Sequence, residues 1–344
     1  MTLTRAVQPR GKNEGREIVM SLSRRRVLQA GAVAAVLPML SRGAFGADYP
    51  NRPIRWIVSF PPGGGNDVVA RLIAQPLSEK LGQSIVVDNK TGAGGNVGMA
   101  ALVNAPPDGY TIGFVGPNNA ISAAVYDNLP FDFIRDTVPV GGTMLLSNVL
   151  EVHPDVPVRS VGELIAYAKA NPGKLNWAHP GAGTSPHMSG ELFKIMAGVD
   201  VTAVPYRGGA PAMADLIPGR VHMMFDNLTG SVEVIKSGRV RALGVSTPKR
   251  VAALPDVPPI SDTIPGFEVN VFHGICVPKG TSREIVDVLY KALSAVIADP
   301  ALQARLVGLG GEALPLSPDA FGKLVATETE KWIKVAKTAN IKVE

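Results

Sequence analysis

Short apolar runs alternate with amphipathic segments along the chain, and stretches rich in glycine and proline separate them. In the first third, the apolar runs predict strands at 54–60, 84–89 and 110–116. The amphipathic segments between and after them predict helices at 66–81, 96–105 and 119–127. Pro76 lies inside the first of these helices and predicts a kink or an early end there.

The pattern repeats after a long extended segment, 138–157, which suits a crossover between two lobes. Ser160 and Glu163 have capping-box spacing and mark the start of a helix. Further strands are predicted at 175–179, 201–206, 221–227, 240–246 and 271–278. Further helices are predicted at 186–197, 211–217 and 229–237, and two more after the last strand, with starts marked by Thr281 and by Ser317-Pro318.

This alternation predicts an α/β protein, because parallel strands joined by helices form sheets that helices cover. The chain of 344 residues is long enough for two hydrophobic cores. Two α/β series, with the C-terminal part returning to the first, predict two lobes with a cleft between them. We expect residues 47–148 to form lobe 1, 149–269 to form lobe 2, and 270–344 to return to lobe 1.

The formal net charge of +5 comes mainly from the first 46 residues. These hold eight of the 34 Lys and Arg and two of the 29 Asp and Glu, which leaves 26 basic and 27 acidic residues in the rest. Because a nearly neutral body offers no basic face to a phosphate backbone, we expect no nucleic-acid partner.

Residues 1–46 have the features of a cleaved signal peptide. Arg24-Arg25 precede an apolar stretch, 27–40, that is too short to cross a membrane. This arginine pair resembles a twin-arginine export signal, and the general secretory route is the alternative. We predict cleavage near Ala47, and Met20 would also start a leader of ordinary length. The expected location is the periplasm, and a single cysteine allows no internal disulfide.

Four strand-to-helix junctions share one backbone chemistry: "PPGGGND" (61–67), "GPNNA" (116–120), "GAGTSPH" (181–187) and "RGGAP" (207–211). In open parallel sheets, ligands lie beyond the carboxyl ends of the strands, where such junctions gather. Glycine lets the backbone approach a ligand, and a helix N-terminus offers unpaired N–H groups with about half a positive charge. The junctions therefore predict a site for a small carboxylate between the lobes.

The residues that we expect to contact this ligand lie at the junctions and at one further strand end. They are Pro62, Gly63, Gly64, Gly65, Asn66, Asp67, Asn118, Gly183, Thr184, Ser185, His187, Tyr206, Arg207 and Asp226. Several have a structural alternative. Asp226 could instead cap the helix that begins near Leu228, Ser185 could be only a helix cap, His187 could be structural, and Arg207 could pair with a surface acid.

Blocks along the whole mature chain resemble the Bug-type substrate-binding proteins, the extracytoplasmic receptors of tripartite tricarboxylate transporters. The blocks include "YPNRPIRWIVSFPPGGGNDVVARLIA", "DNKTGAGGNVGMAALVNAPPDGYT" and "NPGKLNWAHPGAGTSPHMSGELFKIMAGVDVTAVPYRGGAPAMADLIPGRVHMMFDN". The resemblance covers residues 49–344. It implies a two-lobed fold of the periplasmic-binding-protein type (a type II Venus flytrap), each lobe a mainly parallel sheet flanked by helices.

The same resemblance implies a monomer that closes on a small carboxylate and delivers it to the membrane subunits of a transporter. The solute could be a dicarboxylate, a tricarboxylate, an acidic amino acid or an aromatic acid. The family's ligand loops correspond to Gly63–Asp67 and Gly183–His187, and Asp226 faces its cleft. Phe272 and His273 depart from the tryptophan and phenylalanine common there, which could alter the solute if they line the cleft.

The sequence leaves two other functions open. A receptor without a transporter could present its solute to a signalling partner. A secreted hydrolase could use Ser185 and His187, but two residues apart on a helix their side chains diverge by about 200°, which disfavours a nucleophile–base pair. "GAGGNVG" (92–98) imitates a dinucleotide fingerprint, yet Val97 replaces its third glycine. We therefore expect no enzyme, no cofactor and, because the spacing of His and Cys fits no metal, no metal site.

Overall fold

The computed structural model describes residues 49–338 and 341, which belong to one compact unit. The predicted signal peptide and its cleavage point lie outside these residues. The strands are β1 (Ile54–Val58), β2 (Ile85–Asn89), β3 (Thr111–Val115), β4 (Thr137–Val152), β5 (Asn176–His179), β6 (Thr202–Pro205), β7 (Met223–Asn227), β8 (Arg241–Val245), β9 (Asn270–Pro278) and β10 (Gly311–Ala313).

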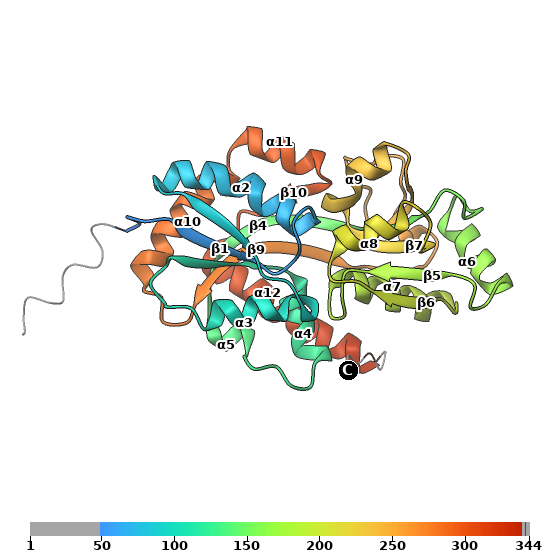
Figure 1. Ribbon diagram of the computed structural model, residues 1–344, viewed down its shortest axis with the longest axis horizontal. Coiled ribbons are helices and arrows are strands. Elements are labelled where there is room, and N and C mark those ends of the chain that lie inside the picture. The colour runs from blue at the N-terminus through green and yellow to red at the C-terminus, as the bar shows by residue number, and fades with distance from the viewer. Residues whose placement is uncertain (1–48, 339–340, 342–344) are drawn as a thin grey trace, which may run out of the picture. The chain divides into compact units, whose positions relative to one another are not determined.

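Helices follow most of these strands (Figure 1). They are α2 (Gly65–Leu81), α3 (Asn96–Val103), α4 (Pro117–Val125), α5 (Phe133–Asp136), α6 (Val161–Ala170), α7 (Ser185–Ala197), α8 (Gly209–Leu216), α9 (Leu228–Lys236), α10 (Arg283–Ile297), α11 (Pro300–Gly308) and α12 (Pro318–Thr338).

The strands are ordered β2-β1-β3-β9-β4-β7-β5-β6, and β8 and β10 also pair with β4. Within each lobe the strands that precede helices run parallel: β1 with β2 and β3, and β5 with β6 and β7. β4 and β9 run antiparallel to their neighbours. Because β4 pairs with β9 through Ser147 and with β7 from Asn148 onward, this one long strand joins the two lobes.

Apolar side chains fill both faces of each half of the sheet. In lobe 1, α2 and α10 cover one face, and α3 and α12 cover the other. In lobe 2, α6 and α7 cover one face, while α8 and α9 cover the other. These helices therefore hold each parallel strand so that its carboxyl end and the next helix start face the opposite lobe.

Serine side chains tie the strands together where they pass between the lobes. The Ser246 amide donates to Ser147 Oγ over 3.0 Å, and the Asn148 amide donates to Ser246 Oγ over 2.9 Å. Ser246 Oγ donates in turn to the Val269 carbonyl over 2.7 Å. The end of β8 and the chain entering β9 are thus held to β4 at the crossing between the lobes, a segment that we call the hinge region.

Three predicted details were wrong. The first is the early end at Pro76: helix α2 continues to Leu81, because the buried side chains Leu72, Ile73 and Leu77 hold it on both sides of the lost N–H. The alternative at Pro76, a kink, stays a prediction. Helix α10 is capped by Ser282, whose hydroxyl accepts from the Ile285 amide, and not by Thr281.

The C-terminal part also contains an additional helix. The sequence predicted two helices after β9, but α11 lies between them and starts at Pro300. The Asp299 carboxylate caps it by accepting from the Ala301 amide over 2.8 Å. An Asp-Pro pair marks a helix start, so the signal was present and was missed.

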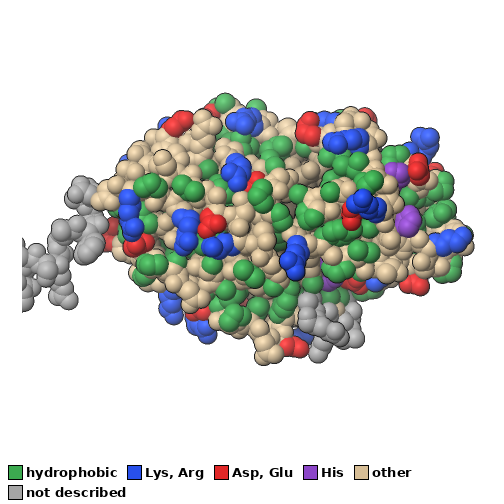
Figure 2. All heavy atoms as spheres, viewed as in Figure 1, with side chains coloured by type: hydrophobic (Ala, Val, Ile, Leu, Met, Phe, Trp, Pro, Cys, Tyr) green, Lys and Arg blue, Asp and Glu red, His purple; other side chains and the backbone are tan. Residues whose placement is uncertain are grey.

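Charged side chains are scattered singly over the face shown in Figure 2, with basic and acidic groups interspersed among apolar and uncharged ones. This face carries no basic patch. Among residues 49–338, no helix is both long enough and apolar enough to cross a membrane.

Candidate ligand-binding cleft

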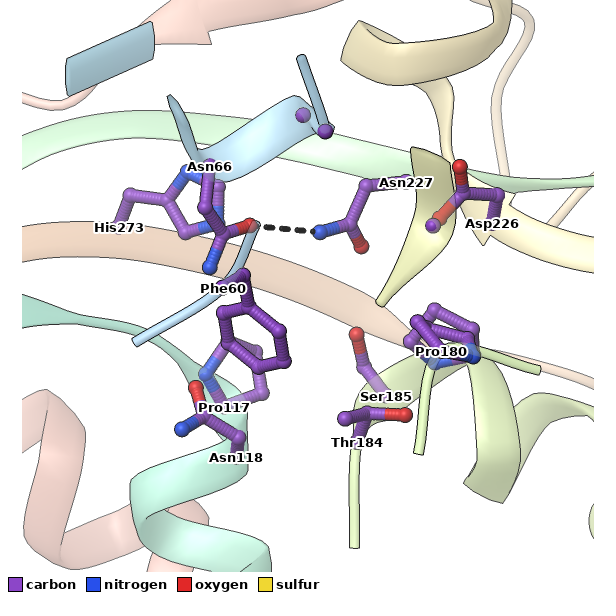
Figure 3. A pocket seen from close by; sticks show the side chains of 14 residues that line it. Phe60, Asn66, Pro117, Asn118, Pro180, Thr184, Ser185, Asp226, Asn227 and His273 are labelled. Carbon is purple, nitrogen blue, oxygen red and sulfur yellow. Dashed lines mark hydrogen bonds between the residues drawn. The ribbon is translucent and has the colours of Figure 1, made fainter. Parts of the chain in front are cut away.

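Five helices begin at one cavity between the lobes (Figure 3). Helices α2 and α4 reach it from lobe 1, and α7, α8 and α9 reach it from lobe 2. The lining consists of Phe60, Gly64, Gly65, Asn66, Pro117, Asn118, Pro180, Thr184, Ser185, Pro186, Gly209, Asp226, Asn227 and His273. First-turn N–H groups have no partner inside their helix, and each helix start carries partial positive charge. The lining contains no Lys or Arg, so a bound anion would be held by backbone dipoles.

The lobe 1 loop is shaped by Asp67, whose side chain is only 5% exposed. Its carboxylate accepts from the Gly63 amide over 2.9 Å, from Arg71 Nε over 3.0 Å and from Asn89 Nδ2 over 2.9 Å. Burial acts to raise the pKa of Asp67, but these hydrogen bonds outweigh it and hold the pKa below its ordinary value. Asp67 therefore fixes the loop and does not line the cavity.

In lobe 2, the N-cap of α7 is Thr184, whose hydroxyl accepts from the His187 amide over 3.4 Å. The alternative role of Ser185 as a cap is therefore wrong, because Ser185 is the first residue of the helix. Its hydroxyl points toward Asn148 Oδ1, 3.5 Å away, and Asn148 Nδ2 donates to Ser189 Oγ over 3.0 Å. Asn148 thus connects the hinge region of β4 to a ligand loop.

The two lobes touch at two places, which we call the two ends of the cleft: beside this cavity, and at Tyr126 and Gly94, which line a second cavity. At one end, Asn227 Nδ2 donates to Asn66 Oδ1 over 3.0 Å, and an added Cβ on Gly230 would lie 3.0 Å from the Gly65 amide nitrogen. At the other end, the Tyr126 hydroxyl donates to the Ala182 carbonyl over 3.2 Å. Gly94, at φ 61°, approaches the same carbonyl so closely that any Cβ there would collide with it. Glycine is required at this contact for both reasons.

The enclosed cavity has a volume of about 30 Å³, enough for a water molecule or a group of carboxylate size. A second cavity of about 270 Å³ shares Phe60 and Pro180 with it and is also lined by Tyr126, Tyr206 and Arg207. A solute larger than a carboxylate would extend from the first cavity into the second, or the lobes would part to admit it.

Buried titratable groups surround the cavity. Burial raises the pKa of Asp226 to about 7, and it lowers the pKa of His273 to about 3. His273 is 1% exposed, and neither ring nitrogen has a hydrogen-bond partner within residues 49–338. A neutral His273 therefore presents a donor and an acceptor to whatever enters.

His187, predicted as a ligand contact, lies in the lobe 2 core instead. Its ring stacks on Trp177 and lies 4.6 Å from the ring of His179, and burial lowers its pKa to about 4. The Ser185 hydroxyl and the His187 ring thus point to different partners, and no hydrogen bond joins them in the described part of the chain. The geometry gives the hydrolase alternative no nucleophile–base pair.

The predicted ligand residues divide into three groups. Those that line the enclosed cavity are Gly64, Gly65, Asn66, Asn118, Thr184, Ser185 and Asp226. Tyr206 and Arg207 line the second cavity. Those that line neither are Pro62, Gly63, Asp67, Gly183 and His187, which shape or support the loops. Helix α9 begins after Asn227, which makes no capping hydrogen bond, and Asp226 does not serve as its cap.

Sequence reasoning missed several lining residues: Phe60, Pro117, Pro180, Pro186, Gly209 and Asn227. All of them except Asn227 lie at or directly next to a recognised junction, and Asn227 directly follows Asp226, so these positions gave a usable signal. His273 was noted only as an unusual residue. It lines the enclosed cavity, whereas Phe272 packs in the lobe 1 core.

A two-lobed α/β chain with helix starts facing one cavity between the lobes defines the class of periplasmic solute-binding proteins. A family model described as "Tripartite tricarboxylate transporter family receptor" matches residues 69–341. The chain belongs to this receptor family, as the resemblance predicted.

Individual relatives agree with this. The UPF0065 protein in the tcbD-tcbE intergenic region of Pseudomonas sp. strain P51 is 40% identical over 317 residues, which cover 92% of this chain and 94% of that one. A Rhodopseudomonas palustris protein solved with adipate is 39% identical, with a TM-score of 0.84, 86% of this chain covered and 99% of that one. MatC of Rhodopseudomonas palustris, solved with bound malate, is 30% identical, with a TM-score of 0.80 and coverages of 83% and 99%.

Proposed function

We propose that this protein is a periplasmic receptor that binds a small carboxylate between its lobes and delivers it to the membrane subunits of a tripartite tricarboxylate transporter. The observation that carries this proposal is the meeting of five helix N-termini from both lobes at one cavity without Lys or Arg. Backbone N–H groups and helix dipoles at such a point favour an anion. Adipate and malate in two related structures support a carboxylate as that anion.

The proposed mechanism is hinge closure. A carboxylate contacts Gly65 and Asn66 in lobe 1 and Thr184 and Ser185 in lobe 2, and these contacts exist together only when the lobes meet. The solute therefore shifts the population toward the closed state. The second carboxylate of a longer solute would lie in the cavity beside Tyr206 and Arg207, whose guanidinium is exposed and available to pair with it.

Thermal unfolding of the chain from Ala47 onward, with adipate, malate and other small carboxylates, tests this function. A solute at 100 times its dissociation constant adds about 2.7 kcal/mol to the free energy of unfolding, which raises the midpoint by several degrees. Gly65→Val should abolish the shift, because an added Cβ at Gly65 would collide with the Thr229 hydroxyl and lie 3.2 Å from the Gly230 amide nitrogen across the cleft.

Gly162→Val is the matched control for this experiment. It lies at the exposed first turn of α6, where an added Cβ has only ordinary contacts at 3.9 and 4.0 Å. The control should keep the full shift. Failure of every carboxylate in the panel to raise the midpoint of the wild-type protein would contradict the proposed function.

A further inference from the structure

Two acidic side chains lie buried together in lobe 2. Glu151 on β4 is 0% exposed and Asp226 on β7 is 4% exposed. In the antiparallel β4–β7 pair, Glu151 lies opposite Met224, and Asp226 lies opposite Val149. Side chains two residues apart on a strand point to the same face. Glu151 and Asp226 are therefore diagonal neighbours, about 7–8 Å apart at Cα, on the face that α8 and α9 cover.

A single hydroxyl donates to this pair. Ser231 on α9 donates to Glu151 Oε1 over 2.9 Å. A hydroxyl has a single proton to donate, so it satisfies only one carboxylate oxygen. Glu151 Oε2 is buried and has no partner within residues 49–338. The pair is therefore short of donors by at least one.

No cation faces the pair from the elements packed around it in the described chain. Four basic side chains on or beside these elements have other partners. Lys236 on α9 pairs with Glu233 at the surface, and Arg220, next to α8, pairs with Asp215. Arg241 on β8 donates to three backbone carbonyls, and Arg71 on α2 pairs with Asp67. His179 and His187 lie with Trp177 on the opposite face of the lobe 2 sheet. The missing donor is therefore a proton.

The pair is in direct communication with the ligand cavity. Asp226 lines the cavity, and its carboxyl group lies between the starts of α8 and α9. An added Cβ on Gly209 would lie 2.7 and 2.8 Å from the two Asp226 oxygens, and one on Gly230 would lie 3.2 Å from Asp226 Oδ2. Negative charge on this carboxyl group would compete with a solute carboxylate for the same helix starts.

We propose that Glu151 and Asp226 form a shared proton site, and that a carboxylate solute binds together with a proton held by this pair. The coupling between solute binding and this proton rests on the proposed function, whereas the proton site itself does not. Burial and the nearby Asp226 charge raise the pKa of Glu151 well above its ordinary value, and burial raises the pKa of Asp226. Both shifts favour a bound proton, as does the shortage of hydrogen-bond donors at the pair. Solute affinity should fall by up to about tenfold per pH unit once the pair loses its proton.

The proton site is tested without any solute. A carboxyl group whose pKa is raised by folding binds more protons in the folded state, so stability falls as pH rises from the ordinary value, about 4, to the folded one. Unfolding midpoints of wild type, Glu151→Gln and Asp226→Asn should be compared across that range and above it. The difference between each variant and wild type should shift in favour of the variant as pH rises.

The slope of this difference is the readout, so a constant loss of stability from an imperfect amide does not affect it. Glu233→Gln, which removes an exposed carboxylate from the same helix as Ser231, is the matched control and should run parallel to wild type. Profiles of Glu151→Gln and Asp226→Asn that also run parallel to wild type would overturn the proton site.

The coupling is tested by calorimetric titration of adipate and malate above neutral pH, in two buffers with different enthalpies of protonation. Wild type should take up a fraction of a proton on binding, and Glu151→Gln, which leaves every lining residue in place but removes one of the two carboxyl groups, should take up less. Equal proton uptake by the two proteins would overturn the coupling but leave the receptor function intact. Absence of binding to wild type would contradict the proposed function, and the solute-free profiles would still decide the proton site.

Discussion

At the scale of single residues, several polar side chains in the predicted ligand loops hydrogen-bond to backbone groups of the same loops. In the proposed binding mode, backbone N–H groups hold the ligand instead of these side chains. Asp67 holds the Gly63 amide, and Thr184 caps α7 by accepting from the His187 amide. These contacts fix the loops in the conformation that directs first-turn N–H groups into the cavity. The proposed binding of a carboxylate therefore depends on loop geometry more than on particular side chains at the anion.

Asp67→Asn tests this role. The asparagine amide carries no charge, and its nitrogen is a donor in the place of a carboxylate oxygen that accepts from two donors. The variant should therefore lose about 1–3 kcal/mol of unfolding free energy at neutral pH. Because the folded pKa of Asp67 lies below its ordinary value, wild type loses this contribution as pH falls below about 4, and the two proteins should converge there. Chemical denaturation at neutral pH and below about pH 4 measures the difference in unfolding free energy between wild type and Asp67→Asn.

Asp88→Asn is the control for this prediction. Asp88 lies on the neighbouring strand β2, and its side chain is 32% exposed and pairs loosely with Arg55 at 3.8 Å and Lys90 at 3.6 Å. Exposed pairs of this kind contribute about 0–1 kcal/mol. A loss at Asp67 no larger than the loss at Asp88 would contradict the loop-fixing role.

At the scale of elements, the starts of α2 and α9 meet directly across the cleft. Gly230 lies in the first turn of α9, and Gly65 is the first residue of α2. Their backbones approach closely only because neither residue has a side chain. Contact between the lobes at this point therefore depends on Gly230. Alanine at this position would stabilise helix α9 by about 1 kcal/mol through its higher helix propensity.

Gly230→Ala should therefore separate stability from binding. In an open molecule the added methyl group adds helix propensity, whereas in the closed molecule it lies 3.0 Å from the Gly65 amide nitrogen. The added methyl group also lies 3.2 Å from Asp226 Oδ2 in the same lobe, which offsets the gain in helix propensity. We expect an unfolding midpoint close to that of wild type, with adipate affinity at least about tenfold lower, equivalent to about 1.4 kcal/mol. Titration calorimetry measures the affinity.

The control for this element is Gly162→Ala, which makes the same exchange in the first turn of α6, away from the cleft. It should leave adipate affinity unchanged. Equal affinities for Gly230→Ala and wild type would mean that the closed contact between α2 and α9 does not contribute to binding.

At the scale of the whole molecule, the lobes are joined by β4 and β9 and by the serine contacts at Ser147 and Ser246. Extended strands bend with little loss of hydrogen bonding. In the proposed closure the lobes rotate about this crossing, and the contacts at Asn66–Asn227 and Tyr126–Ala182 form at the end of the rotation.

Small-angle X-ray scattering in solution should detect this rotation. The radius of gyration of the chain from Ala47 should fall when adipate is added at saturation, because closure brings the lobes together. Gly230→Ala should show a smaller fall at the same occupancy. An unchanged radius of gyration on saturation of wild type would contradict hinge closure.

The sequence by itself determined the α/β class, most helix and strand positions to within one or two residues, and the four junctions that carry the cleft. These features follow from local periodicity and from glycine and proline at helix starts, which act over a few residues. The family also follows from the sequence, because its motifs are continuous blocks. The lobe boundaries at 148 and 269 remain predictions.

Only the tertiary structure decided which side chains reach the cavity. His187 has the same local signal as Thr184 and Ser185, yet its position two residues after Ser185 on the helix directs it into the core beside Trp177. His273 and Glu151 come from strands far from every recognised junction, so no local pattern could place them at the site or next to Asp226. Side-chain direction and the pairing of distant strands depend on how the lobes pack, and that is a property of the folded chain as a whole.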